Sequence, residues 1–171
     1  IGVDRMVIYT NDSRDGTDAM LDRMAVMGLG ILRRDNPARP GDKPQPAALR
    51  AATRDPAVIE SDWILPIDSD EFVAVKTGAG RLPDLIDAVP EGATGIVLTW
   101  RIMGSAGLTA WNPGLVTESY PTGARDGFRR GWGVKTLFRP FPHMKLGIHR
   151  PGIRGAGNNP DRLATLRVQP W

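Results

Sequence analysis

Short apolar runs alternate with amphipathic stretches along the first half of the chain. Residues 6–10 and 63–67 are runs of β-branched, aromatic and other apolar side chains, and each ends in a polar cluster. Such runs predict buried strands that meet loops. Between them, apolar side chains recur at helical spacing over residues 18–27, and glycines follow at positions 28 and 30. This pattern predicts an amphipathic helix that ends at the glycines.

The remaining elements follow in the same rhythm. We expect strands at residues 31–33, 95–103, 134–138 and 145–149. One helix opens near residue 47 and continues toward residue 59 with an interruption near Pro56, and another covers residues 82–89. This order of strands, acidic loops and helices is typical of βαβ units, so we predict an α/β fold with a mostly parallel sheet flanked by helices.

The composition is that of one globular domain. The chain has 171 residues, of which 41% are hydrophobic and 24% are charged, so it has enough apolar surface for a core and does not belong to a disordered class. No apolar run approaches the roughly 18 residues that a membrane-spanning helix needs. The absence of cysteine excludes disulfide scaffolds and thiolate metal sites, so a metal would need oxygen ligands, His143 or His149.

Positive charge is concentrated in the last third of the chain, although the net charge is only +3. The basic residues of this region, set against only Asp126 and Asp161, are Arg125, Arg129, Arg130, Lys135, Arg139, Lys145, Arg150, Arg154, Arg162 and Arg167. Two interpretations stay open, namely a solvated face and a surface that binds an anionic ligand.

The acidic stretch from Asp68 to Phe72, which reads D-S-D-E-F, is the strongest chemical signal. It directly follows a predicted strand, and ligands of parallel α/β sheets bind beyond the carboxyl ends of strands. In an extended chain Asp68 and Asp70 point the same way and are able to reach one divalent cation. The alternative is an acidic turn that caps the next helix.

A second polar loop, N-D-S-R-D-G-T at residues 11–17, follows the first predicted strand. The carboxylate of Asp12 at the strand tip can accept hydrogen bonds from a nucleoside, and the helix that opens at Gly16 and Thr17 favours negative charge. The alternative is an Asx-turn with a helix cap.

Further motifs follow in the second half of the chain. They are W-R-I-M-G-S-A-G at residues 100–107, P-G-L-V-T-E-S-Y at 113–120, K-T-L-F-R-P at 135–140 and H-R-P at 149–151. In their order, these motifs and the two acidic loops resemble the family-two-like glycosyltransferases with a GT-A fold, in the group marked by D-x-D-E-F. The resemblance covers about residues 2–151, and Met103, Ala106 and Tyr120 depart from the family pattern.

The resemblance implies a GT-A-like (Rossmann-like) sheet in one catalytic domain over residues 1–171. Its nucleotide and metal half would cover about residues 1–100, and its basic, acceptor-side half about residues 101–171. Members of the family carry an Asn-Glu segment and a helix before the position of Ile1, so we expect the fold to be incomplete at the N-terminus and weakly active alone.

The same resemblance, read with the side-chain chemistry, assigns roles to individual residues. The expected nucleotide-binding residues are Asp12, Asp15, Asp68, Lys135 and Arg139; the Mn²⁺ or Mg²⁺ ligands are Asp68, Asp70 and His149; the sugar and acceptor residues are Trp100, Gly104 and Ser105; and the general base is Glu118. Each has a structural alternative: an ion pair with a nearby arginine for Glu118, a structural hydrogen bond for His149, and solvation for Lys135 and Arg139.

We therefore expect a metal-dependent transfer, with inversion, from a nucleotide-diphosphosugar to a hydroxyl of a saccharide or other acceptor. A nucleotidyltransferase of similar fold is one alternative, although its Gly-rich basic loop is not visible after the first strand. A non-catalytic module that binds nucleic acid or another anionic polymer is the other, and no recognised nucleic-acid motif supports it. We expect a cytoplasmic protein, conceivably at the inner face of a membrane.

Overall fold

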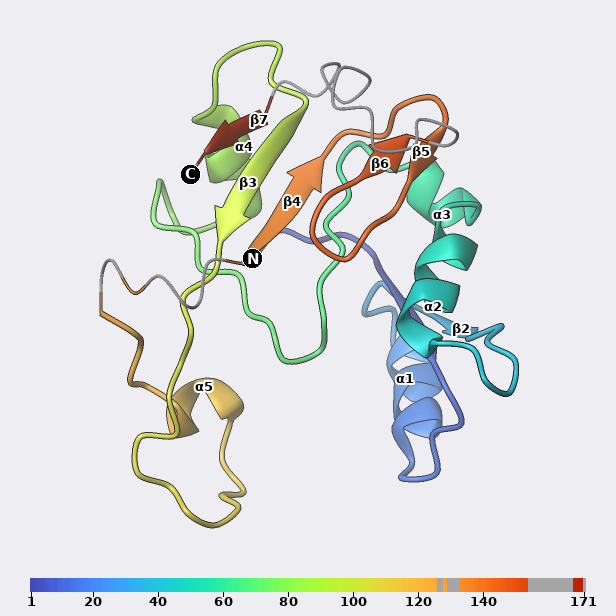
Figure 1. The fold of residues 1–171 in the computed structure, drawn as a ribbon, viewed down its shortest axis with the longest axis vertical. Coiled ribbons are helices and arrows are strands. Elements are labelled where there is room, and N and C mark those ends of the chain that lie inside the picture. Colours follow the sequence, from blue (N-terminus) through green and yellow to red (C-terminus); the bar gives the residue numbers. More distant parts are fainter. Residues whose placement is uncertain (126–127, 129–132, 154–167, 171) are drawn as a thin grey trace.

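The structure is a computed structural model that describes residues 1–125, 128, 133–153 and 168–170 (Figure 1). Helices and short strands alternate along the chain. In order they are β1 (Met6–Thr10), α1 (Thr17–Val26), β2 (Ile31–Asp35), α2 (Pro44–Ala52), α3 (Pro56–Ile59), α4 (Leu82–Asp87), β3 (Gly95–Thr99), α5 (Val116–Ser119), β4 (Val134–Phe138), β5 (Met144–Lys145), β6 (Gly152–Ile153) and β7 (Val168–Pro170).

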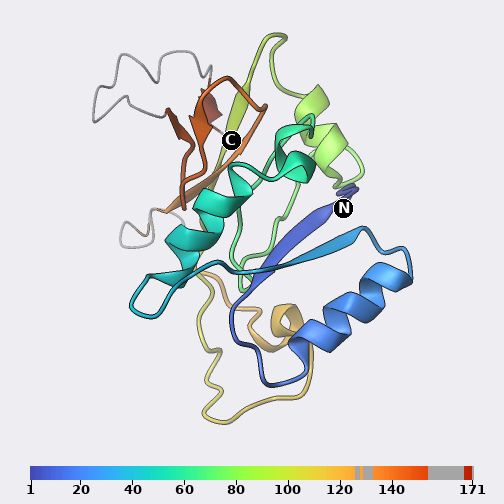
Figure 2. The same cartoon turned by 90° about the vertical axis from the view of Figure 1, so that its right-hand side faces the viewer.

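The N-terminal part is a βαβ unit, as the pattern predicts. β1 and β2 pair in parallel over their full lengths, from Met6 opposite Ile31 to Thr10 opposite Asp35. Figure 2 shows α1 and α2 on opposite sides of this strand pair. Gly30 allows the close return of the chain, because its φ is +70° and a Cβ atom there would lie 2.4 Å from a neighbouring backbone carbonyl oxygen.

A three-stranded sheet in the order β4-β3-β7 forms the second part of the fold. β3 pairs antiparallel with β4 and parallel with β7. Side chains alternate between the faces of β4, so that Phe138 and Leu137 enter different cores. Phe138 packs with residues of α2, α3 and β5, whereas Leu137 packs with Leu82 and Leu85 of α4. β4 therefore lies between two apolar clusters.

The segment at residues 63–67 differs from the strand that its apolar run predicts. Only one bridge forms there, in which Ile64 and Phe138 exchange backbone hydrogen bonds of 2.8 and 3.0 Å. Pro66 lacks the N–H group that a longer ladder requires. The described residues form three separate sheets, namely the parallel β1–β2 pair, the mixed β4-β3-β7 sheet and the antiparallel β5–β6 pair, where the sequence predicts one mostly parallel sheet.

Several element boundaries also differ from the sequence pattern. The apolar run at residues 95–103 forms a strand only as far as Thr99, and the run at 145–149 contributes only the end of β5. The interruption predicted near Pro56 is confirmed, because α2 ends at Ala52 and Asp55 caps a new helix that begins at Pro56. Among the helices that the structure describes, none has the length and apolar character needed to cross a bilayer.

Candidate functional site

Lys135 joins distant parts of the chain at the start of β4. Its side chain is only 5% exposed, and its ammonium nitrogen lies 3.0 Å from Asp68 Oδ2 and 3.1 Å from Glu71 Oε2. Burial of an ammonium group without charged partners carries a large desolvation cost. The two carboxylates offset this cost, so the ion pairs hold the acidic stretch against the end of β4.

Residues 68–71 form a tight turn. Glu71 N donates a hydrogen bond of 3.1 Å to the Asp68 carbonyl oxygen, and the Glu71 carboxylate accepts one of 2.9 Å from Asp68 N. Both carboxylate oxygens of Asp68 are engaged, since Oδ1 accepts from the side-chain amide of Gln45 and Oδ2 from Lys135. Gln45 lies in the first turn of α2, so this helix also contributes to the site.

Asp70 lies at a corner of this turn. The expectation that Asp68 and Asp70 point the same way assumed an extended chain, and the turn replaces that geometry. Asp70 is exposed, and it makes no hydrogen bond or ion pair with another residue in the part of the chain that the structure describes.

The expected metal ligands do not form one group. Within residues 1–125, 128, 133–153 and 168–170, no three carboxylate or imidazole side chains gather closely enough to hold a metal ion. Asp68, Asp70 and His149 are therefore not assembled into a single ligand set in this structure.

Trp100 and His149 meet at the same end of β4. Trp100 N donates to the Gly133 carbonyl oxygen over 2.9 Å, and the indole ring covers Gly133, where a Cβ atom would lie 2.0 Å from it. The Trp100 and His149 rings pack edge to face, with centroids 5.3 Å apart. His149 Nδ1 lies 3.1 Å from the Val134 carbonyl oxygen. Because that oxygen only accepts, this contact is a hydrogen bond when Nδ1 carries a proton.

The loop after β1 is organised by helix capping. Asp15 Oδ1 accepts a hydrogen bond of 3.0 Å from Thr17 N, and the hydrogen bonds from Thr17 lower the pKa of Asp15. Gly16, with φ of 89°, precedes the first residue of α1. The Asx-turn interpretation therefore accounts for Asp15. Asp12 remains exposed, with a positive φ of 50°.

Arg139 lies at the opposite end of β4 from the candidate site. Its guanidinium group stacks over the Trp63 ring, 4.6 Å from the ring centroid. The Arg139 guanidinium therefore has a partner different from those of Lys135, which contacts Asp68 and Glu71.

The remaining predicted residues belong to a projecting segment, residues 101–123, which we name the α5 limb after the helix that it carries. Gly104 N donates to the Thr122 carbonyl oxygen over 2.8 Å, and Ser105 begins a turn that closes at Leu108. Glu118 lies in α5, is exposed, and has no arginine partner among the described residues.

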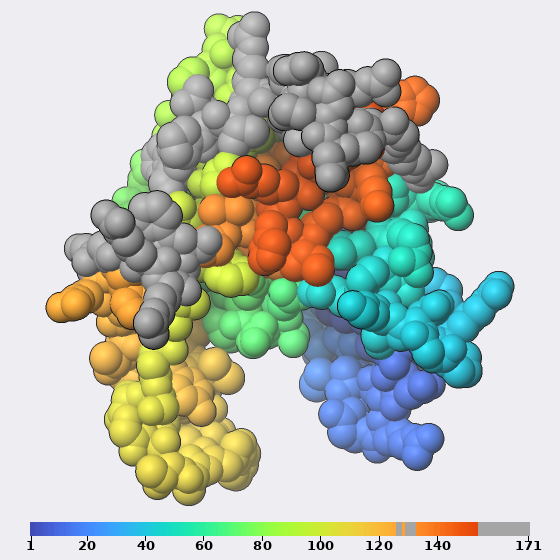
Figure 3. Space-filling view, in the orientation of Figure 1, coloured from blue at the N-terminus to red at the C-terminus, as the bar shows by residue number. Residues whose placement is uncertain are grey.

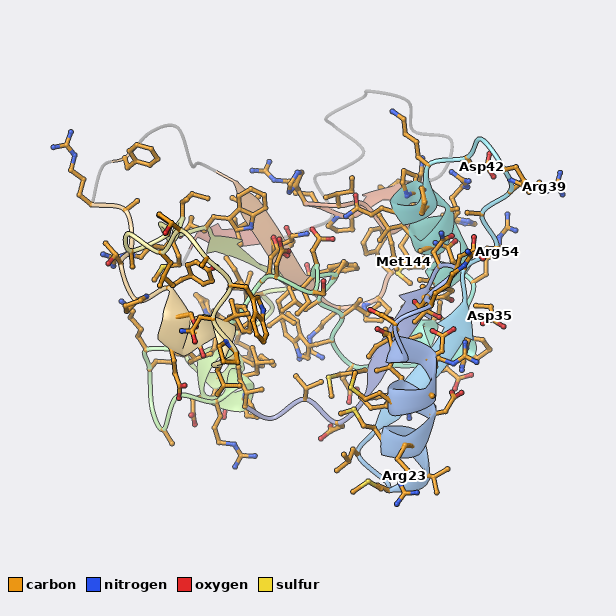
Figure 4. All side chains as sticks on the ribbon, turned by 90° about the horizontal axis from the view of Figure 1, so that it is seen from below. Arg23, Asp35, Arg39, Asp42, Arg54 and Met144 are labelled. Atoms are coloured by element: carbon orange, nitrogen blue, oxygen red, sulfur yellow. The ribbon has the colours of Figure 1, made fainter. Side chains whose placement is uncertain are left out.

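A hollow separates the α5 limb from a second projection, residues 11–30, which carries α1. Figure 3 shows the two projections in yellow and blue, with the green segment around residues 65–75 at the head of the hollow. Figure 4, seen from below, places the labelled Arg39 and Asp42 at the outer edge beyond α2, away from α5. The turn at residues 68–71 thus belongs to the segment that borders the hollow.

Glu71 and Gln45 were not assigned roles from the sequence. Glu71 belongs to the D-x-D-E-F stretch, which is the signal that could have identified it. Gln45 lies in a Pro-rich region with no motif, and only its contact with Asp68 reveals it. A separate cavity of about 380 Å³, lined by Thr53, Ile59 and residues 140–144, contains none of the predicted site residues.

In comparisons with known proteins, the chain matches no protein-family model, no curated protein and no solved structure.

Proposed function

We propose that this chain is a metal-dependent glycosyltransferase that moves a sugar from a nucleotide-diphosphosugar to a hydroxyl of a saccharide or other acceptor. The ion pair between Lys135 and Asp68 carries the proposal. It links the D-x-D-E-F turn to the K-T-L-F-R-P strand, and Trp100 and His149 meet at Gly133 and Val134, where that strand begins. Residues predicted from separate motifs thus lie around one end of β4, which supports a common site.

Each residue of this site has a role in the proposed transfer. Lys135 neutralises the diphosphate group, and the exposed part of the Trp100 ring offers an apolar face to the sugar. Asp12, on the other projection, holds the nucleoside. Glu118, on the α5 limb, takes the proton of the attacking hydroxyl. The hollow between the projections would hold the donor and the acceptor together.

The carboxylates at the turn are of the chemical type that binds Mg²⁺ or Mn²⁺, and Asp68 would have to exchange its contacts with Lys135 and Gln45 for the cation. Such ions prefer oxygen ligands and are commonly held by one or two carboxylates together with waters and substrate phosphates. Asp68 and Asp70 offer two carboxylates, so a third protein ligand is not required. A cation bound there would stabilise the negative charge of the leaving diphosphate. In this proposal the protein is cytoplasmic and does not bind nucleic acid.

The proposal is tested by nucleotide binding with this chain. Thermal shift and calorimetry with uridine and guanosine diphosphates, each with and without Mn²⁺, should reveal metal-dependent binding. The variant Asp68→Asn should lose at least about tenfold in affinity, because it removes a ligand charge and the partner of Lys135. Asp62→Asn, at an exposed position outside the site, is the matched control and should bind as the wild type does.

Reaction products separate this function from its alternatives. A glycosyltransferase releases a nucleoside diphosphate from a nucleotide sugar, whereas a nucleotidyltransferase releases pyrophosphate from a nucleoside triphosphate. Salt-dependent binding of oligonucleotides without any binding of nucleotide sugars would indicate an anionic-polymer module and would refute the proposal.

A further inference from the structure

We propose that Lys135 is an internal cation that competes with a divalent metal ion for Asp68 and moves to the diphosphate when both ligands bind. Metal and diphosphate would then bind as a pair, and neither would bind tightly alone. This inference rests on the function proposed above, and it concerns the order and coupling of binding at the same site.

The argument begins with the occupancy of the Asp68 carboxylate. Lys135 Nζ lies 3.0 Å from Oδ2, and the side-chain amide of Gln45 binds Oδ1. A cation that bound Asp68 at the usual metal–oxygen distance of about 2.1 Å would lie within about 5 Å of the ammonium group. Two positive charges at that separation repel each other strongly in a partly buried site. Lys135 therefore opposes the binding of a metal ion alone.

Glu71 provides a second position for the ammonium group. Its Oε2 lies 3.1 Å from Lys135 Nζ, and its side chain is 19% exposed, compared with 40% for Asp68. Since the lysine stem is flexible, the ammonium group can leave Asp68 while it keeps its contact with Glu71. The more exposed carboxylate is thus the one that becomes available to a ligand from solvent.

A diphosphate supplies the partner that Lys135 loses. Its oxygens accept hydrogen bonds from an ammonium group and also bind a metal ion, so they satisfy both cations at once. Arg139 is stacked on Trp63 at the far end of β4, which leaves Lys135 as the described basic side chain that contacts the turn. By linkage, the diphosphate must then raise the affinity for the metal by the same factor as the metal raises the affinity for the diphosphate.

Calorimetry of the full chain tests this coupling. Mn²⁺ and uridine diphosphate are titrated alone and each in the presence of the other, with the Mn²⁺–nucleotide complex in solution included in the fit. The wild type should show a coupling of at least about fivefold. Lys135→Met should bind Mn²⁺ alone about fivefold or more tightly than the wild type does, and its coupling should largely disappear. Lys76→Met, at an exposed position without a partner among the described residues, should leave both quantities unchanged.

A second variant decides the matter if Lys135→Met does not fold, as judged by circular dichroism. Glu71→Gln removes the alternative position of the ammonium group, so Lys135 should hold Asp68 more firmly. Mn²⁺ alone should then bind more weakly and the coupling should increase. A simple loss of nearby negative charge would weaken both binding modes equally and leave the coupling unchanged, which would overturn the inference.

The outcomes also separate this inference from the function on which it rests. If the wild type binds Mn²⁺ and uridine diphosphate but Lys135→Met shows neither tighter Mn²⁺ binding nor reduced coupling, the competition is refuted and the glycosyltransferase proposal stands. If the wild type, Lys135→Met and Glu71→Gln all fail to bind either ligand, both are refuted.

Discussion

Replacement of Asp55 by asparagine should lower the free energy of unfolding at pH 7, and this loss should become smaller at low pH. The Asp55 carboxylate, 6% exposed, accepts hydrogen bonds of 3.2 Å from the Tyr9 hydroxyl, 2.9 Å from Arg34 Nε and 2.9 Å from Ala57 N. It therefore ties β1, β2 and the start of α3 together. Asparagine keeps the shape of the side chain and the oxygen that caps α3, but it removes the charge and replaces the oxygen that accepts from Tyr9 and Arg34 with an amide group that only donates.

The expected loss is about 2 kcal/mol at pH 7. A hydrogen bond to a charged group contributes about 1.5–3 kcal/mol, and the amide N–H groups of asparagine cannot replace the oxygen that accepts from Arg34. The Arg34 side chain is 40% exposed, so water compensates in part and the lower half of this range applies. Asp55→Ala should cost about 1 kcal/mol more, because the helix cap is lost as well.

The dependence on pH follows from the pKa of Asp55. Burial alone would raise this pKa, but the hydrogen bonds from Arg34 and Ala57 and the charge of Arg34 outweigh burial and lower it. A carboxyl group with a lowered pKa in the folded state stabilises the fold above its unfolded pKa, which is about 3.9, and loses that contribution as the pH falls through the folded value. The difference between wild type and Asp55→Asn should therefore shrink below about pH 4.

Urea unfolding, followed by circular dichroism at pH 7 and at pH 3, measures this difference. Asp62→Asn is the matched control, because Asp62 is exposed and forms no hydrogen bond or ion pair with another described residue; the stability of this variant should follow the wild type at both pH values. An Asp55→Asn variant as stable as the wild type at pH 7, or equally destabilised at both pH values, would refute the reasoning.

Three further predictions follow from the core and the backbone. Leu85→Ala should lower the free energy of unfolding by about 2–5 kcal/mol, because Leu85 is 1% exposed, whereas Leu115→Ala at 66% exposure should change it little; urea unfolding measures both. Gly30→Ala should cost at least about 1–2 kcal/mol and more than Gly28→Ala, since both have positive φ but only Gly30 faces a backbone oxygen; thermal unfolding of the two variants gives the comparison. Burial, with the charge of a nearby carboxylate, raises the pKa of Tyr9 to about 12, so ultraviolet titration should show one phenol that ionises well above the ordinary value near 10.

The local pattern of apolar residues was sufficient to predict the βαβ unit at the N-terminal end of the described chain. The helix over residues 18–27 and its end at Gly28 were predicted to within one or two residues, because apolar spacing and a glycine after the last turn depend only on neighbours in the chain. By the same criteria, the apolar run at residues 63–67 also predicts a strand. Its single bridge to Phe138 depends on Pro66 and on a partner far along the chain, which periodicity does not describe.

The candidate site shows the same division between local and long-range information. The sequence by itself determined that carboxylates follow the 63–67 segment, that Lys135 lies in the predicted strand at residues 134–138 and that His149 follows this strand, because residue types and their order can be read directly from the chain. Only the tertiary structure decided that Lys135 pairs with Asp68, which lies 67 positions earlier, that Gln45 binds the other Asp68 oxygen, and that Arg139 stacks on Trp63 instead. These contacts result from the packing of α2, β4 and the turn at residues 68–71 against one another, and side-chain pairing between distant segments leaves no periodic signal in the sequence.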